Sequence, residues 1–163
     1  KDALIKAANI AHDSGRLVAF SLSDPFCVAR HRDEFKSLLL KHIDILFANE
    51  DEIISLFESK TFEQALLSIE KMCKLSVITR GSKGAVIINA GKTMKIDSCI
   101  VQDVVDTTGA GDAFAAGFLY GFTNNLSLED AGRIGAICAA DIITFYGARP
   151  KPTISKKVEL LMK

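Results

Sequence analysis

The sequence has 163 residues, of which 48% are hydrophobic and 25% are charged. This length is sufficient for one domain with a proper core, and this composition excludes a disordered chain or a small disulfide-stabilised scaffold. Because its 20 basic and 20 acidic residues balance, neither a nucleic-acid surface nor a polybasic membrane anchor is expected.

Short apolar runs predict strands, and apolar residues spaced three or four apart predict helices. The first half is expected to hold a helix at residues 3–11, a strand at 17–20, a helix at 32–41, a strand at 43–48, helices at 52–57 and 62–72, and a strand at 76–79. Asp24-Pro25 is interpreted as a turn. Continuously apolar strands alternating with amphipathic helices are typical of a parallel sheet with helices on both faces.

The second half is expected to hold, in order, strands at 85–88 and 92–96 and helices at 113–122 and 128–146. The two strands flank Asn89-Ala90-Gly91, which predicts an antiparallel hairpin at one end of the sheet. Ser127 and Asp130 form a weak capping box for the last helix. The fold prediction is therefore one α/β domain over residues 1–163, with a Rossmann-like parallel sheet and an added hairpin.

The four cysteines (Cys27, Cys73, Cys99 and Cys138) are scattered without C-x-x-C spacing, so they are expected to be inert reduced thiols in a cytoplasmic protein. No apolar run approaches the ~20 residues that a membrane-spanning helix needs, and no basic segment followed by an apolar run predicts a leader, so a membrane protein is not expected. The chain starts at Lys1 within a helical pattern and without Met, so we expect that an earlier part of the protein is missing.

The most informative stretch runs from Asp106 to Phe114 and reads DTTGAGDAF. An extended segment enters a turn of small residues that opens directly into a helix. Gly109 and Gly111 leave the backbone N–H groups uncovered, and with the helix dipole these groups can bind a phosphoryl oxygen. The alternative is that both glycines only permit a tight turn and that Asp112 only complements the helix dipole.

The whole string resembles the signature of the PfkB, or ribokinase-like, carbohydrate kinases. The resemblance implies that Gly109, Ala110 and Gly111 form the anion hole for the transferred phosphoryl group. It also implies that Asp112 is the catalytic base, and that Asp106 and Thr108 match positions that hold a potassium ion in several relatives.

Two further elements are similar to family motifs. Asn49 and Glu52 resemble the N-x-x-E element that helps to organise magnesium, for Glu52 through water, and the phosphates. Thr79, Gly81 and Gly84 resemble the T-x-G-x-x-G turn along the nucleotide phosphates. Taken alone, Asn49 could be only a helix N-cap, and the two glycines could be plain hairpin residues.

The last long helix departs from the family pattern. Family members often carry Asn or His where the adenine base packs, and here Ala136 takes that position. The resemblance then implies apolar packing of the base by Ala136, Ile137 and Ala140. The alternative is that these residues only belong to the core.

Residues 21–26 and 44–50 look more like adenosine kinases than like other members. The resemblance implies ATP-dependent, magnesium-dependent phosphorylation of a primary hydroxyl of a nucleoside or sugar, with no nucleic-acid or membrane partner. The alternatives are a ribokinase- or fructokinase-type sugar kinase, or a non-catalytic nucleotide-binding fragment. Family members are about twice as long, so the chain is expected to be the C-terminal nucleotide-binding part, to need the missing N-terminal half, and to be inactive alone.

Overall fold

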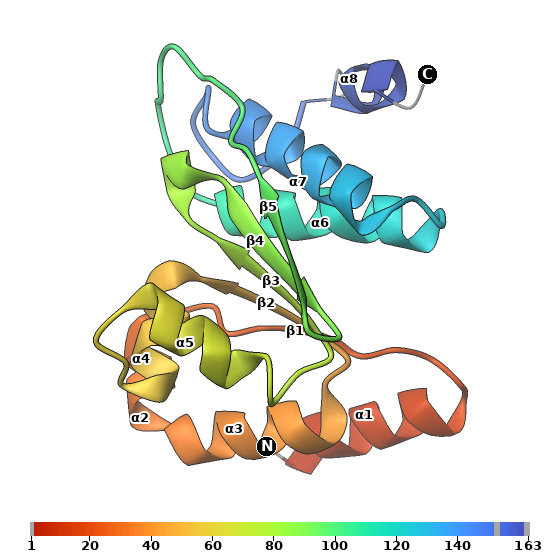
Figure 1. Cartoon of the computed structure of the whole chain (residues 1–163). Coiled ribbons are helices and arrows are strands. Elements are labelled where there is room, and N and C mark those ends of the chain that lie inside the picture. The colour runs from red at the N-terminus through yellow and green to blue at the C-terminus, as the bar shows by residue number, and fades with distance from the viewer. Residues whose placement is uncertain (1, 152–153, 162–163) are drawn as a thin grey trace. The chain divides into compact units, whose positions relative to one another are not determined.

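The computed structural model of the chain describes residues 2–151 and 154–161 (Figure 1). It divides into two compact units, of which the first comprises Lys1–Thr79 with Ile88–Thr93 and the second comprises Arg80–Ile87 with Met94–Lys163. Five strands form one mixed, mostly parallel sheet in the order β1-β2-β3-β4-β5. The predicted α/β class is thereby confirmed.

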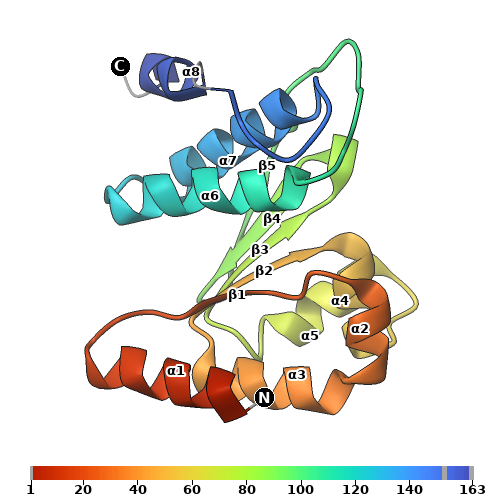
Figure 2. The ribbon, with the colours of Figure 1, turned by 180° about the vertical axis from the view of Figure 1, so that it is seen from behind.

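The first unit alternates strands and helices. Its elements are α1 (Asp2–Asp13), β1 (Ala19–Ser21), α2 (Pro25–Arg30), α3 (Arg32–His42), β2 (Ile45–Asn49), α4 (Glu50–Phe57), α5 (Phe62–Ile69) and β3 (Leu75–Thr79). The strands β1, β2 and β3 are parallel, with Ala19 paired to Ile45 and Ile45 paired to Leu75. Figures 1 and 2 show α1 to α5 on one side of these three strands.

Burial explains why β2 and β3 are apolar throughout. Four of the five residues in each strand are buried, which is typical of a parallel strand covered on both faces. β1 is different, because it is only three residues long and its outer residues are exposed. The apolar run at 17–20 therefore gives a shorter, edge-type strand than its composition suggests, and Leu17 is exposed.

Helix α2 corrects the sequence analysis, which interpreted Asp24-Pro25 as a turn only. The Asp24 side chain accepts hydrogen bonds from the N–H groups of Phe26 and Cys27, and Pro25 occupies the first helical position. Both are helix-start signals, because an N-cap carboxylate satisfies free N–H groups and proline has none to satisfy. The pair therefore begins a helix.

The remaining elements are η1 (Gly81–Lys83), β4 (Ala85–Asn89), β5 (Lys92–Ile96), α6 (Ala110–Thr123), α7 (Leu128–Ile142) and α8 (Ile154–Leu161). β4 and β5 are neighbours joined by Ala90 and Gly91 alone, which both have positive φ. A connection of two residues can only join antiparallel strands, so the predicted hairpin is confirmed. Ser127 caps α7 by accepting from the N–H group of Asp130, as the sequence predicts.

Helices α6 and α7 pack closely in the second unit because glycines lie at their contact. A Cβ atom at Gly117 would lie 2.8 Å from the Cys138 sulfur, and one at Gly121 would lie 2.7 Å from the Cα of Ala131. Real Cβ atoms do not approach so closely, so the two helix backbones need these glycines. None of the described helices is long and apolar enough to cross a membrane.

Helix α7 ends at Ile142, four residues before the predicted end at Tyr146. In a continuing helix the N–H of Gly147 would donate to the carbonyl of Ile143. The Gly147 N–H instead donates to the Asp106 carboxylate at 3.0 Å, and the Ile143 carbonyl accepts from Val105 at 2.8 Å. Contacts with a distant loop therefore take up the two groups that a helix reaching Tyr146 would pair with each other, and such contacts cannot be predicted from the local sequence.

Candidate active site

The glycine turn at 109–111 opens directly into α6. Gly109 is the N-cap with φ of 80°, in the left-handed region, and no side chain caps the helix. The N–H groups of Gly111 and Asp112 have no hydrogen-bond acceptor among the described residues. Uncapped N–H groups at the positive end of a helix dipole form a binding site for an anionic oxygen.

Gly109 and Gly111 of this turn differ in whether the structure requires a glycine at their position. A Cβ atom at Gly109 would lie 2.7 Å from the Cβ of Ala148, so packing and the positive φ both require glycine there. At Gly111 an added Cβ would meet no atom within 4 Å, and the residue has ordinary helical geometry. Nothing in the described chain requires glycine at 111, which leaves open space beside its N–H group.

Asp112 lies in the first turn of α6 and is exposed. Its carboxylate makes no hydrogen bond or ion pair with the described residues. An acidic group in the first helical turn is favourable for the dipole, but this carboxylate is also free to accept a proton from a bound molecule. The structure therefore places a candidate base in the first turn of α6, three residues after the N-cap Gly109.

Asp106 holds the loop that leads into the turn. Its two carboxylate oxygens accept from the N–H of Thr108 at 2.9 Å and from the N–H of Gly147 at 3.0 Å. The Thr108 hydroxyl, the Thr108 N–H and the Gly147 N–H lower the pKa of Asp106 from its ordinary value, because all three stabilise the ionised form. Asp106 is therefore an ionised anchor beside the candidate phosphate site.

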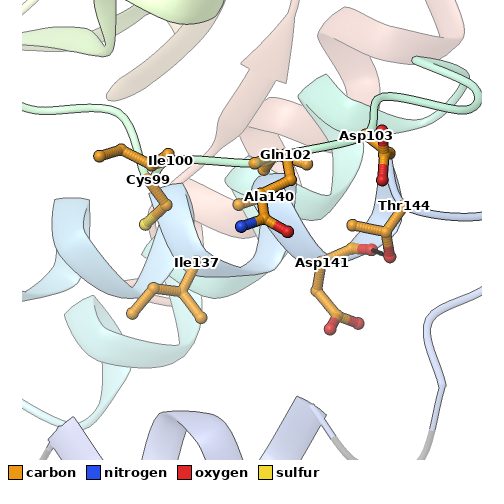
Figure 3. A pocket seen from close by; sticks show the side chains of 9 residues that line it. Cys99, Ile100, Gln102, Asp103, Ile137, Ala140, Asp141 and Thr144 are labelled. Atoms are coloured by element: carbon orange, nitrogen blue, oxygen red, sulfur yellow. Dashed lines mark hydrogen bonds between the residues drawn. The ribbon is translucent and has the colours of Figure 1, made fainter.

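A hollow of about 510 Å³ lies between the loop at 99–103 and helix α7 (Figure 3). Its wall combines apolar and polar side chains from this loop, from α7 and from the residues just after α7: Cys99, Ile100, Val101, Gln102, Asp103, Ile137, Ala140, Asp141 and Thr144. Ala140 and Ile137, which the sequence assigns to base packing, belong to this wall. Ala136 is 7% exposed and is not part of it.

In the first unit, Asn49 and Glu52 form a full capping box at the end of β2. Asn49 Oδ1 accepts from the Glu52 N–H at 2.8 Å, while the Glu52 carboxylate accepts from both the N–H and the side-chain amide of Asn49 at 2.9 Å. Glu52 is only 4% exposed. Burial raises its pKa, and the nearby charges of Asp24 and Asp51 raise it further, against a lowering effect of the Asn49 N–H.

Thr79 joins this group through the sheet, because it ends β3 directly opposite Asn49 in the parallel register. Its hydroxyl donates to the Ala48 carbonyl at 3.4 Å. Three predicted residues thus meet at the carboxyl edge of the first unit, which is where ligands bind in open α/β sheets. Asp24, which follows β1, lies at the same edge and was not included in the predicted site.

Gly81 and Gly84 belong to the second unit and bound the short helix η1. Both have positive φ, of 57° and 80°. An added Cβ at Gly84 would overlap the Ile96 carbonyl oxygen, whereas one at Gly81 would meet nothing within 4 Å. Gly84 therefore has a sufficient packing reason, and the role of both glycines at a nucleotide stays a prediction.

Comparisons with known proteins identify related sequences and folds. The family model of "pfkB family carbohydrate kinase" matches residues 1–154. A solved structure described as a probable sugar kinase of Rhizobium etli is 42% identical, with a TM-score of 0.94 over 97% of this chain and 48% of its own. The adenosine kinase of Sinorhizobium meliloti is 39% identical, with a TM-score of 0.95 over 98% of this chain and 49% of its own.

A more distant structure is the ribokinase of Arabidopsis thaliana complexed with ribose and ATP. It is 25% identical, with a TM-score of 0.77 over 99% of this chain and 52% of its own. The chain therefore spans about half the length of each of these proteins.

Proposed function

Because the chain belongs to the pfkB family of carbohydrate kinases, we propose that it is the nucleotide-binding part of an ATP-dependent phosphotransferase acting on a nucleoside or sugar. The observation that carries this proposal is the start of α6. There the N–H groups of Gly111 and Asp112 have no acceptor among the described residues, and the exposed Asp112 carboxylate is next to them. An anion site and a base within one helical turn suit transfer of a phosphoryl group to a hydroxyl.

In the proposed reaction the acceptor hydroxyl oxygen attacks the γ-phosphorus of ATP. The new phosphorus–oxygen bond forms as the bond to ADP breaks, and the hydroxyl proton passes to the Asp112 carboxylate. The N–H groups of Gly109, Gly111 and Asp112 stabilise the charge on the transferred oxygens. The Ala110 N–H, which the resemblance also assigns to this role, already donates to the Thr107 carbonyl at 3.1 Å. Such transition states are loose, so positioned donors contribute most of the catalysis.

The hollow beside α7 is the proposed site of the nucleotide base. Ile137 and Ala140 offer an apolar surface for a flat ring, and Gln102 and Thr144 offer polar groups at its edge. Base pockets commonly combine an apolar lining with a few polar groups that fix orientation. Ala136, being buried, would support this surface from behind rather than touch the base.

Magnesium fits the acidic edge of the first unit only as a water-rich ion. Both oxygens of the buried Glu52 already accept hydrogen bonds from Asn49. Among the described residues, no group of three or more His, Cys, Asp or Glu side chains is arranged to hold a metal directly. Mg²⁺ commonly keeps several waters and binds to phosphates, where it neutralises their charge. Asn49 and Glu52 would then orient its waters.

Potassium at Asp106 and Thr108 is a separate part of the proposal. The Asp106 carboxylate is ionised and only half-buried, which suits a monovalent cation, although each of its oxygens already accepts one hydrogen bond from a backbone N–H group. Dependence of kcat on added KCl, compared with NaCl at equal ionic strength, tests this assignment.

Adenosine is the favoured acceptor within this proposal. Residues 21–26 carry the adenosine-kinase-like stretch, and the Phe26 ring that ends it is 77% exposed. An exposed aromatic ring can stack on the aromatic face of a purine, which a free sugar does not have. The two most similar structures described above do not decide the matter, since one is a probable sugar kinase and the other an adenosine kinase.

The assay described below also distinguishes two alternative functions. A ribokinase- or fructokinase-type enzyme would share the phosphate chemistry and differ in the acceptor. A non-catalytic nucleotide-binding chain would bind ATP without transferring phosphate, and the chain does span only about half of its relatives.

The test is a coupled ADP-release assay on the full-length protein with adenosine, ribose, fructose and tagatose at equal concentration. We expect the highest kcat/KM with adenosine. Asp112→Asn should lower kcat by about 10² to 10⁴, the usual contribution of a general base, with little change in ATP affinity. A preference for a free sugar would agree with the kinase proposal and contradict adenosine as the acceptor. A variant that keeps more than half of the kcat would remove the role of Asp112.

A further inference from the structure

The loop at 105–109 is attached to the segment that follows α7 by several contacts. The N–H groups of Val105 and Asp106 point to the Ile143 carbonyl at 2.8 and 3.4 Å. On the other side of the same loop, Ala148 fills the space where a Cβ of Gly109 would lie. The loop that carries the glycine turn therefore rests on residues 143–148.

Asp106 is the side chain that joins these two segments. One of its oxygens accepts from Thr108, which lies within the loop, and the other accepts from Gly147, which lies 41 residues away. This second bond uses the N–H that would otherwise continue α7. One carboxylate thus fixes the internal shape of the loop and its attachment at the same time.

We propose that Asp106 is a positioning residue for the phosphoryl site: it holds the glycine turn on residues 143–148, which keeps the free N–H groups of Gly109, Gly111 and Asp112 in place for the transferred oxygens. This inference rests on the proposed function, because it concerns the geometry of the same turn. It also gives α7 a role, since the end of α7 that lines the base hollow is continuous with the segment that supports the turn.

The two acceptor oxygens predict a graded series of variants. Asn in place of Asp106 keeps one acceptor oxygen but presents an NH₂ group to the other donor, so it can satisfy only one of Thr108 and Gly147. Ala satisfies neither. Asp97 provides the matched control, because it is an exposed aspartate of the same unit whose side chain has no hydrogen bond or ion pair with the described residues.

The experiment compares Asp106→Asn, Asp106→Ala and Asp97→Ala in the full-length protein. Loss of one donor from a pre-arranged anion site lowers kcat by roughly 10²- to 10³-fold, so we expect about 10²-fold for Asp106→Ala and an intermediate loss for Asp106→Asn. The KM for the acceptor should change by less than about threefold, because Asp106 holds the donors that act on the transition state rather than the acceptor. Asp97→Ala should match the wild type.

Hydrogen–deuterium exchange gives a readout that does not need activity. Asp106→Ala should speed exchange in peptides covering 107–112 and 143–148, while peptides covering β4 and β5 exchange as in the wild type. Equal kcat in Asp106→Ala and Asp97→Ala, or unchanged exchange at 107–112, would overturn the proposal. If the wild-type protein phosphorylates no acceptor, the proposed function fails and the exchange result alone decides whether Asp106 positions the turn. If Asp106→Ala does not fold, Asp106→Asn decides by the same criteria.

Discussion

Gly111→Ala separates a structural glycine from a functional one. Glycine in a helix is less stable than alanine by about 0.5 to 1 kcal/mol, because glycine loses more backbone freedom on folding. At Gly111 the added methyl group would meet no atom within 4 Å apart from its chain neighbours and the backbone of its own helix, so no clash offsets this gain. The residue lies in the first turn of α6, where about half of the gain applies, so we expect a Tm higher by about 1 to 2 °C.

Activity should change in the opposite direction. In the proposed function, the open space at Gly111 is where the transferred phosphoryl group lies, and a methyl group there would hold it away from the Gly111 and Asp112 N–H groups. Losing one such donor costs about 10²- to 10³-fold in kcat. We therefore expect a more stable protein that has lost at least about 10²-fold in kcat.

The assay pairs thermal unfolding with single-turnover phosphoryl transfer in the full-length protein. Gly121→Ala is the matched control, because its methyl group would lie 2.7 Å from the Cα of Ala131 at the α6–α7 contact. That variant should lose stability while its folded fraction keeps its kcat. A Gly111→Ala protein with wild-type kcat and KM would refute the assignment of this turn as the phosphoryl site.

Three further predictions concern stability and assembly. Gly84→Ala should lower the free energy of unfolding by at least about 2 kcal/mol, measured by urea denaturation, because it adds an overlap with the Ile96 carbonyl to an unfavourable positive φ. Asn49→Ala should cost about 2 kcal/mol by the same method, since it removes an N-cap and the side-chain amide that donates to the buried Glu52 while the backbone N–H of residue 49 stays, whereas Asn49→Ser should restore the cap alone. Residues 1–163 alone should self-associate in light scattering and transfer no phosphate, because β1 ends the sheet with open backbone groups; a monomer that turns over would contradict this.

Local signals were sufficient to predict most elements. The alternation around Ala90-Gly91 gave the hairpin, and continuous apolar runs gave β2 and β3, because these patterns depend on neighbours in the sequence. Helix α2 was missed although its signals were present, since a helix of six residues beginning at Asp24-Pro25 looks like a turn. The end of α7 could not be predicted, because it depends on Val105 and Asp106, which lie far away in the sequence.

The candidate site was predictable in composition but not in detail. The sequence identified Gly109 and Gly111 together. The structure shows that packing against Ala148 requires glycine at 109, while no described neighbour requires it at 111. The same holds for Ala136 and Ala140, which are one helical turn apart and of which only Ala140 faces the hollow. The Gly147 N–H was not predictable as a partner of Asp106, because every residue except proline has a backbone N–H and the sequence does not tell which one donates.

The close contact of α6 and α7 has a consequence for reading large mutational surveys. Every substitution of Gly117 or Gly121 adds a Cβ atom against the neighbouring helix, so these positions should tolerate almost no replacement in a saturation library selected for growth. Asp112, which lies about one and a half turns before Gly117 on the same helix, should be equally intolerant of replacement, but because of its chemistry. A survey scored by survival alone would therefore class all three residues as catalytic. A parallel measurement of protein abundance in the cell would show that Gly117 and Gly121 are needed for folding, whereas Asp112 is needed for activity.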